Sequence, residues 1–145
     1  MQKETFVVAY EGDESDSSLL DFAIARAKKN DARIVLAHIL EWSPYKFLTP
    51  EELEERHKRR GEELNRAETD IVAPALDKIR SAGVEADAVL KHGNVIDLLV
   101  SISAEAGASM VFCGRSGSNS VAARLFGSVP MGLAQISVVP IVIVP

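Results

Sequence analysis

Five short apolar runs alternate along the chain with longer segments in which apolar residues recur every three or four positions. The runs cover residues 5–10, 33–40, 85–91, 109–113 and 140–144. Most are nearly continuous in Val, Ile, Leu, Phe and Ala, which is typical of strands buried on both faces of a parallel sheet. The run at 85–91 alternates apolar and polar residues instead, which predicts an edge strand.

The segment after the first run has helical periodicity. Its apolar positions at helical spacing are Leu19, Leu20, Ala23, Ile24 and Ala27. Ser15, Asp16 or Ser17 can cap the helix that this spacing predicts.

The next helix has a clear start signal. Thr49 is a candidate N-cap, Pro50 is suited to the first turn, and Glu52 occupies the reciprocal position of a capping box. Pro74 has no backbone donor and therefore kinks or divides this helical segment. Gly83 is suited to end it.

Two further helices complete the pattern. One spans residues 94–106 and stops at Gly107. Its inward positions are Ile96, Leu99 and Ile102. The last begins at Ser128 and tolerates Pro130 in its first turn. Strands and helices that alternate in this way predict a doubly wound α/β fold with right-handed crossovers and helices on both faces of the sheet.

Composition narrows the class of protein. The 145 residues are 47% hydrophobic and 26% charged, as expected for one domain that spans residues 1–145. The net charge of −5 argues against nucleic acid as a partner. No apolar run approaches the roughly 18 residues that cross a membrane, and the first residues lack the features of a signal peptide. The single cysteine cannot form an internal disulfide. We therefore expect a cytoplasmic protein without a membrane partner.

Candidate chemistry lies after the first and fourth strands, because ligands of open parallel sheets collect at the carboxyl ends of strands. An acidic turn, residues 10–15, follows the first strand, and the glycine-serine stretch 114–120 follows the fourth. Gly127 and Ser128 then open a helix, where backbone N–H groups and the helix dipole favour an anion. Arg115 and Arg124 supply positive charge nearby.

Turn formation alone is an alternative explanation of these glycines and serines. The Ser128 hydroxyl can donate to a phosphate or cap its helix, and the two roles compete. The chain has no Gly-x-x-x-x-Gly-Lys-Ser/Thr motif and no Gly-x-Gly-x-x-Gly after the first strand, so the common nucleotide fingerprints are absent.

Other chemically active side chains have structural explanations. His38 lies inside a strand pattern, which favours a hydrogen-bonded core residue over a ligand. His57 and His92 are far apart and suggest no metal site. Cys113 fits as a small packing residue before Gly114, with redox sensing as the alternative. Three aromatic residues after the second strand could form a stacking lid or cover the core; they are Trp42, Tyr45 and Phe47.

The spacing of the glycines resembles that of a known family. Gly114, two residues, Gly117, nine residues, Gly127 and Ser128 match the motif of the nucleotide-binding branch of the universal stress protein family. The closing strand from Pro140 to Val144 also resembles that family, and the similarity covers essentially the whole chain.

The resemblance implies a five-stranded parallel sheet in the order 3-2-1-4-5 and a site for ATP, ADP or AMP, with Mg²⁺ held by the phosphates as an option. The residues implied at the phosphates are Gly114, Gly117, Gly127 and Ser128. Further nucleotide-binding residues implied beside them are Arg115, Ser116 and Val129. Ile39 would offer backbone groups to adenine, and Ala9 and Tyr10 would line the base and ribose. Glu11 stands where the family usually has an Asp on the ribose side.

The resemblance also implies a regulatory protein of stress response or signalling rather than an enzyme. It suggests a homodimer through the strand from Pro140 to Val144, with nucleotide-dependent dimer contacts and an unknown protein partner. Prolines that merely protect an edge strand are the alternative explanation of Pro140 and Pro145. A slow ATPase or phosphotransferase and a ligand-free dimeric adaptor remain open.

Overall fold

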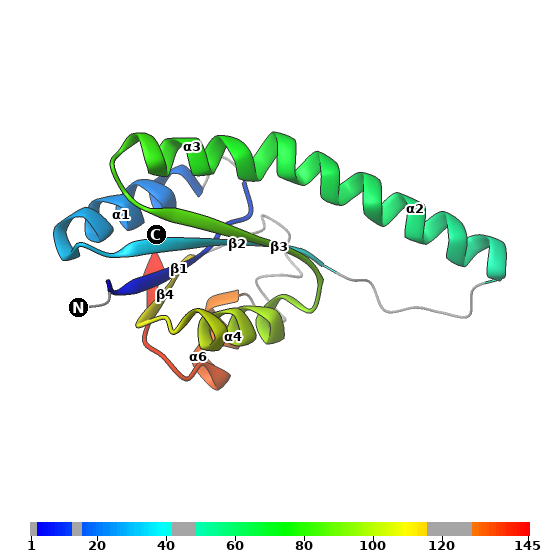
Figure 1. Cartoon of the computed structure of the whole chain (residues 1–145). Coiled ribbons are helices and arrows are strands. Elements are labelled where there is room, and N and C mark those ends of the chain that lie inside the picture. The colour runs from blue at the N-terminus through cyan, green and yellow to red at the C-terminus, as the bar shows by residue number, and fades with distance from the viewer. Residues whose placement is uncertain (1–2, 13–15, 42–48, 116–128) are drawn as a thin grey trace.

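The sheet has five parallel strands, in the order β3-β2-β1-β4-β5. The computed structural model describes residues 3–12, 16–41, 49–115 and 129–145 (Figure 1). The strands are β1 (Thr5–Ala9), β2 (Arg33–Glu41), β3 (Ala86–Gly93), β4 (Met110–Gly114) and β5 (Ile141–Val144). Every predicted strand is therefore confirmed, as is the implied order. The alternating strand, β3, lies at an edge as its pattern predicts.

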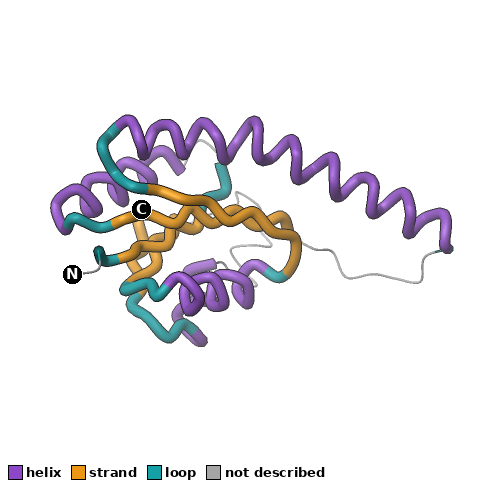
Figure 2. The backbone as a smooth tube through the Cα atoms, viewed as in Figure 1, coloured by secondary structure: helices purple, strands orange, loops and turns teal. Residues whose placement is uncertain are grey.

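Helices cover both faces of the sheet, which confirms the doubly wound class (Figure 2). One face is covered by α1 (Asp16–Asn30), the π-helical turn η1 (Glu68–Val72) and α3 (Ala73–Ser81). The other face is covered by α4 (Val95–Ala106) and α6 (Val129–Ile136). The remaining helix, α2 (Pro50–Ala67), precedes η1 and extends beyond the sheet (Figure 1).

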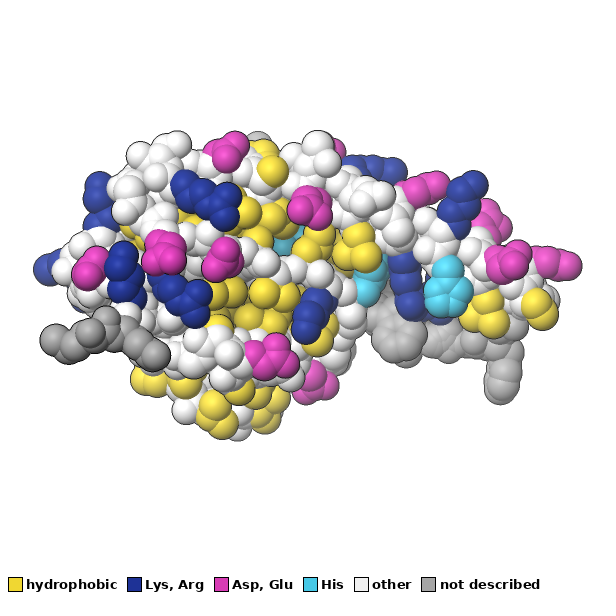
Figure 3. All heavy atoms as spheres, in the orientation of Figure 1, with side chains coloured by type: hydrophobic (Ala, Val, Ile, Leu, Met, Phe, Trp, Pro, Cys, Tyr) yellow, Lys and Arg dark blue, Asp and Glu magenta, His cyan; other side chains and the backbone are white. Residues whose placement is uncertain are grey.

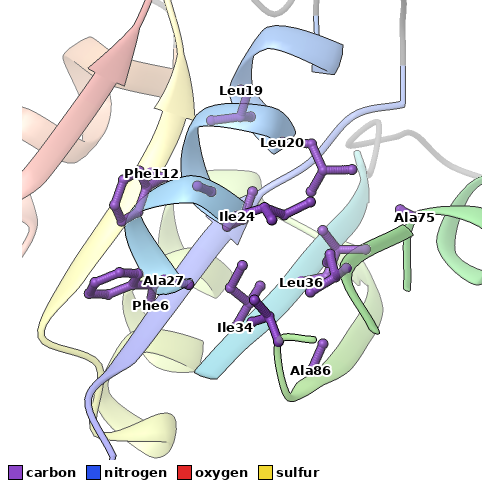
Figure 4. Close-up of a cluster of buried hydrophobic side chains, with 14 of the residues drawn as sticks. Phe6, Leu19, Leu20, Ile24, Ala27, Ile34, Leu36, Ala75, Ala86 and Phe112 are labelled. Atoms are coloured by element: carbon purple, nitrogen blue, oxygen red, sulfur yellow. The ribbon is translucent and has the colours of Figure 1, made fainter. Parts of the chain in front are cut away.

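Alternation along β1 sends its side chains into two separate cores. Phe6 packs in the core beneath α1, together with Phe112 of β4, and their ring centroids are 5.0 Å apart. Figure 4 shows Leu19, Leu20 and other α1 side chains in this core. Val7 points to the opposite core. Burial on both faces explains the nearly continuous apolar run of this strand.

The helix ends at Thr49 and Gly107 follow the predicted residues, whereas Asn94, expected as the first residue of its helix, is the N-cap of α4. The Thr49 hydroxyl accepts the Glu52 N–H at 3.1 Å. The Asn94 side chain accepts the Asp97 N–H at 3.0 Å, and Gly107 ends α4 in the left-handed conformation at φ 63°. These bonds satisfy backbone groups that a helix end leaves without partners.

Pro74 divides its helical segment rather than only kinking it. Pro74 has no N–H to donate to the carbonyl of Asp70, so the α-helical ladder is interrupted at this point. The wide turn η1 occupies residues 68–72, and α3 begins directly after it with Pro74 in its first turn. The helix therefore continues in two parts joined by a π-helical turn.

The mixed charges of α2 form a solvated face. Ala67 is its one buried residue among those described. Figure 3 shows acidic and basic side chains intermixed over its projecting end. Glu63 contacts β3, where its carboxylate lies 3.5 Å from His92 Nε2. Neither α2 nor any other helix in the described ranges combines the length and apolar character needed to cross a membrane.

Truncation of a core residue and of an exposed residue should have different effects on stability. Ile79 of α3 is fully buried, so Ile79→Ala is expected to lower the free energy of unfolding by about 2–5 kcal/mol. Leu53 of α2 is 44% exposed, and Leu53→Ala should change it by less than about 0.5 kcal/mol. Urea denaturation measures both. A large loss in Leu53→Ala would contradict a solvated α2.

Candidate functional site

A cavity of about 300 Å³ lies at the carboxyl ends of β1, β2 and β4. β1 stands between β2 and β4, so the chain reverses its direction of growth across the sheet at this strand. The first crossover helix, α1, covers one face, and α4 covers the other. Such a reversal leaves a crevice beyond the strand ends, and ligands of open α/β sheets bind there.

Six of the residues expected at the site line this cavity. They are Ala9, Tyr10, Glu11, Ile39, Gly114 and Val129. Arg115 is described but does not line the cavity, and its backbone N–H donates to the Val144 carbonyl at 2.9 Å. Ser116, Gly117, Gly127 and Ser128 lie outside the described residues, as do the aromatic residues proposed for a lid. The cavity thus brings together the ends of β1 and β2 and the start of the glycine stretch.

Several residues that line the cavity are not among the site residues expected from the sequence. They are Asp16, Ala37, His38, Leu40, Glu41, Val95, Leu99 and Cys113. The position of Glu41 at the carboxyl end of β2 is a signal that could have identified it. Leu99 was expected to face inward, and that same orientation brings it to the cavity wall.

Asp16 organises the turn between β1 and α1. Its carboxylate oxygen Oδ2 accepts the N–H groups of Glu11 and Gly12 at 2.5 and 3.0 Å. The side chain is only 2% exposed, and it stands at the start of α1, where the helix dipole favours negative charge. A Cβ atom added to Gly114 would lie 3.6 Å from the Asp16 oxygen Oδ1. The carboxylate therefore lies between the ends of β1 and β4.

His38 is a buried, hydrogen-bonded residue, as predicted, and it also lines the cavity. Its Nδ1 lies 2.7 Å from the carbonyl oxygen of Tyr10. Because a carbonyl can only accept, the hydrogen of the neutral ring is on Nδ1. This bond joins the second strand to the segment that follows the first.

Cys113 is a packing residue rather than an activated thiol. It is 1% exposed, and burial raises the pKa of its thiol to about 11. A protonated thiol is a poor nucleophile, so the conditions for redox sensing are not met.

The cavity combines an apolar wall with carboxylates. Ala9, Ile39 and Leu99 belong to or pack on the core beneath α4 and form the apolar part. Glu11 and Glu41 are exposed at the strand ends and line the cavity from the solvent side. This arrangement suits a flat, apolar group that carries hydroxyl or amino donors, because carboxylates accept hydrogen bonds.

The fold is an α/β domain with a cavity at the point where the strand order reverses. The model of the universal stress protein family matches residues 3–145, and the chain belongs to this family. Among curated proteins, it is similar to universal stress protein YxiE of Bacillus subtilis (strain 168). The two are 23% identical over 151 residues, which cover 95% of this chain and 96% of that protein.

Two solved structures with the same fold contain nucleotides. One is a universal stress protein in complex with cAMP, with a TM-score of 0.66 and 24% identity over 99% of this chain and 98% of that one. The other is a universal stress protein from Archaeoglobus fulgidus in complex with dAMP, with a TM-score of 0.65 and 18% identity over the same shares. At these identities the likeness shows the fold.

Burial of Cys113 should make stability fall at high pH. Well below pH 9 the thiol is protonated in both states and has no effect on stability. Above it the unfolded chain loses a proton that the folded chain keeps up to about pH 11, so ionisation favours unfolding. We expect this loss between pH 9 and 11 to be smaller in Cys113→Ala, measured by urea denaturation. An equal loss in both proteins would contradict the burial of this thiol.

Proposed function

We propose that the chain binds an adenine nucleotide in the cavity at the ends of β1, β2 and β4 and acts as a regulatory protein. The observation that carries this proposal is the convergence of six expected site residues on one cavity at the reversal of strand order. The cAMP and dAMP complexes of proteins with the same fold support an adenine nucleotide as the ligand.

The lining residues suit the parts of an adenine nucleotide. The apolar wall with Ala9 and Leu99 would pack against the base, and the backbone of Ile39 would pair with its edge. The carboxylate of Glu11 would accept from ribose hydroxyls. The phosphates would lie over Gly114 and the glycine-serine stretch that follows it. Arg115, which follows Gly114 directly, would supply positive charge here, and ATP would bring Mg²⁺ on its phosphates.

We further propose a homodimer through the edge strand β5, whose contacts change with nucleotide. Apolar side chains on and beside this edge are exposed, with Val138 at 74% and Ile143 at 48%. Met131 and Ile136 of the adjoining α6 are 58% and 47% exposed. Exposed apolar groups gathered in this way are typical of an interface. A nucleotide-dependent dimer would transmit the state of the site to a protein partner during stress, in the cytoplasm.

Nucleotide binding should raise the melting temperature of nucleotide-free protein. At 100 times its dissociation constant a ligand stabilises by about 2.7 kcal/mol, which corresponds to a shift on the order of 5–10 °C. Thermal melts with AMP, cAMP, ADP and Mg²⁺-ATP measure the shift. Ala9→Leu would fill the cavity and should remove it.

A matched variant controls for the added volume. Ala104 of α4 is exposed and outside the cavity, so Ala104→Leu should keep the full shift. No shift of the wild-type protein with any of these nucleotides at millimolar concentration would refute the proposed function. A full shift in Ala9→Leu would place the site elsewhere.

Charge on the edge strand should disrupt the dimer. Ile143→Lys would bury a cation against its symmetry copy, and we expect sedimentation velocity to show monomers where the wild-type protein forms dimers. Leu53→Lys, on the exposed side of α2, should leave the dimer intact. If the wild-type protein is still monomeric at 100 times the protein concentration used in the thermal melts, this interface is refuted.

A further inference from the structure

Two nearly buried polar side chains hold the same short segment of backbone at the mouth of the cavity. His38, 5% exposed, donates from Nδ1 to the Tyr10 carbonyl, and Asp16, 2% exposed, accepts from the N–H groups of Glu11 and Gly12. The Tyr10 N–H in turn donates to the Ala37 carbonyl at 2.9 Å. Residues 10–12 are therefore held from the second strand on one side and from α1 on the other.

Packing does not explain an imidazole at position 38. The ring nitrogen Nε2 is buried, and no described residue forms a hydrogen bond with it. A buried polar atom without a partner costs free energy, which an apolar side chain of similar size would avoid. The neighbouring positions on this face, Leu36 and the register partner Leu90, are apolar. The bond from Nδ1 to Tyr10 is what an apolar residue could not supply.

The segment is also held from a third direction. Gly12 has φ +87°, and a Cβ atom there would lie 2.6 Å from Cγ2 of Ile71 in η1. The turn therefore packs closely against η1. Any residue other than glycine at this position would bring its Cβ atom into Ile71. Glu11 lies between the two bonds, since the carbonyl before it is bound by His38 and its own N–H is bound by Asp16.

We propose that His38 is a positioning residue for sugar recognition, which acts through the Tyr10 carbonyl and together with Asp16 to aim the Glu11 carboxylate at the ribose hydroxyls. This inference rests on the proposed adenine-nucleotide site. On this proposal, sugar selectivity depends on the hydrogen bonds that fix the backbone of residues 10–12. Loss of the His38 bond should then remove the preference for a hydroxylated sugar while the apolar wall still binds the base.

The test compares AMP with 2′,3′-dideoxy-AMP, which lacks both sugar hydroxyls, by isothermal titration calorimetry. The wild-type protein should prefer AMP by about tenfold or more, as a hydrogen bond to a charged group predicts. In His38→Leu this ratio should fall close to one, with affinity for the dideoxy nucleotide retained. Glu11→Ala should give the same loss of preference.

Two variants control this comparison. In His38→Asn the side-chain amide N–H takes the place of Nδ1–H, so the preference for AMP should return. His57→Leu makes the same change at an exposed histidine of α2 and should keep the wild-type ratio. If His38→Leu binds both nucleotides more weakly by an equal factor, the residue is merely structural and the proposal is wrong.

Other outcomes separate this inference from the proposed function. Equal binding of AMP and dideoxy-AMP by the wild-type protein overturns sugar positioning but leaves the nucleotide site standing. Binding of neither nucleotide overturns both. A separate measurement does not depend on any variant: nitrogen-15 NMR of the wild-type protein at pH 8 should show His38 as the Nδ1–H tautomer. The Nε2–H tautomer would exclude the bond to Tyr10 and overturn the proposal.

Discussion

Burial of β1 is the constraint on which the rest of the structure depends. This strand forms hydrogen bonds with β2 on one edge and β4 on the other, and Phe6, Val7 and Val8 are fully buried. Both of its faces must be covered, so the chain sends helices to each side of the sheet. The strand has only five residues, and the cavity lies at its carboxyl end.

The site follows from the way backbone groups are satisfied beyond that strand end. Backbone N–H and C=O groups that leave a sheet in a buried place need other partners. Ala37, His38 and Asp16 provide them for residues 10–12. The same polar side chains that close the end of β1 therefore also shape the cavity.

Local signals predicted most of the fold, and long-range bonds account for what they missed. Strand runs, the N-cap Thr49 and the helix stop Gly107 depend on neighbours in sequence, so patterns identified them correctly. The rule of strand ends also located Glu11 and Gly114. The role of His38 depends on a partner 28 positions away, so it becomes visible only with the strand register. Pro74 indicated an interruption of the helix, but the π-helical form of η1 is apparent only in the structure.

The wide turn η1 sets the rotational phase of the helix that comes before it. An α-helix turns by about 100° per residue, so removing one residue from η1 would rotate α2 by that angle relative to α3. Glu63 would then leave His92, although the composition of α2 would be unchanged. Ile71 would likewise lose its place over Gly12. Insertions and deletions of single residues are therefore expected to be rarer at 68–72 than substitutions, even though Glu68, Thr69 and Asp70 are exposed.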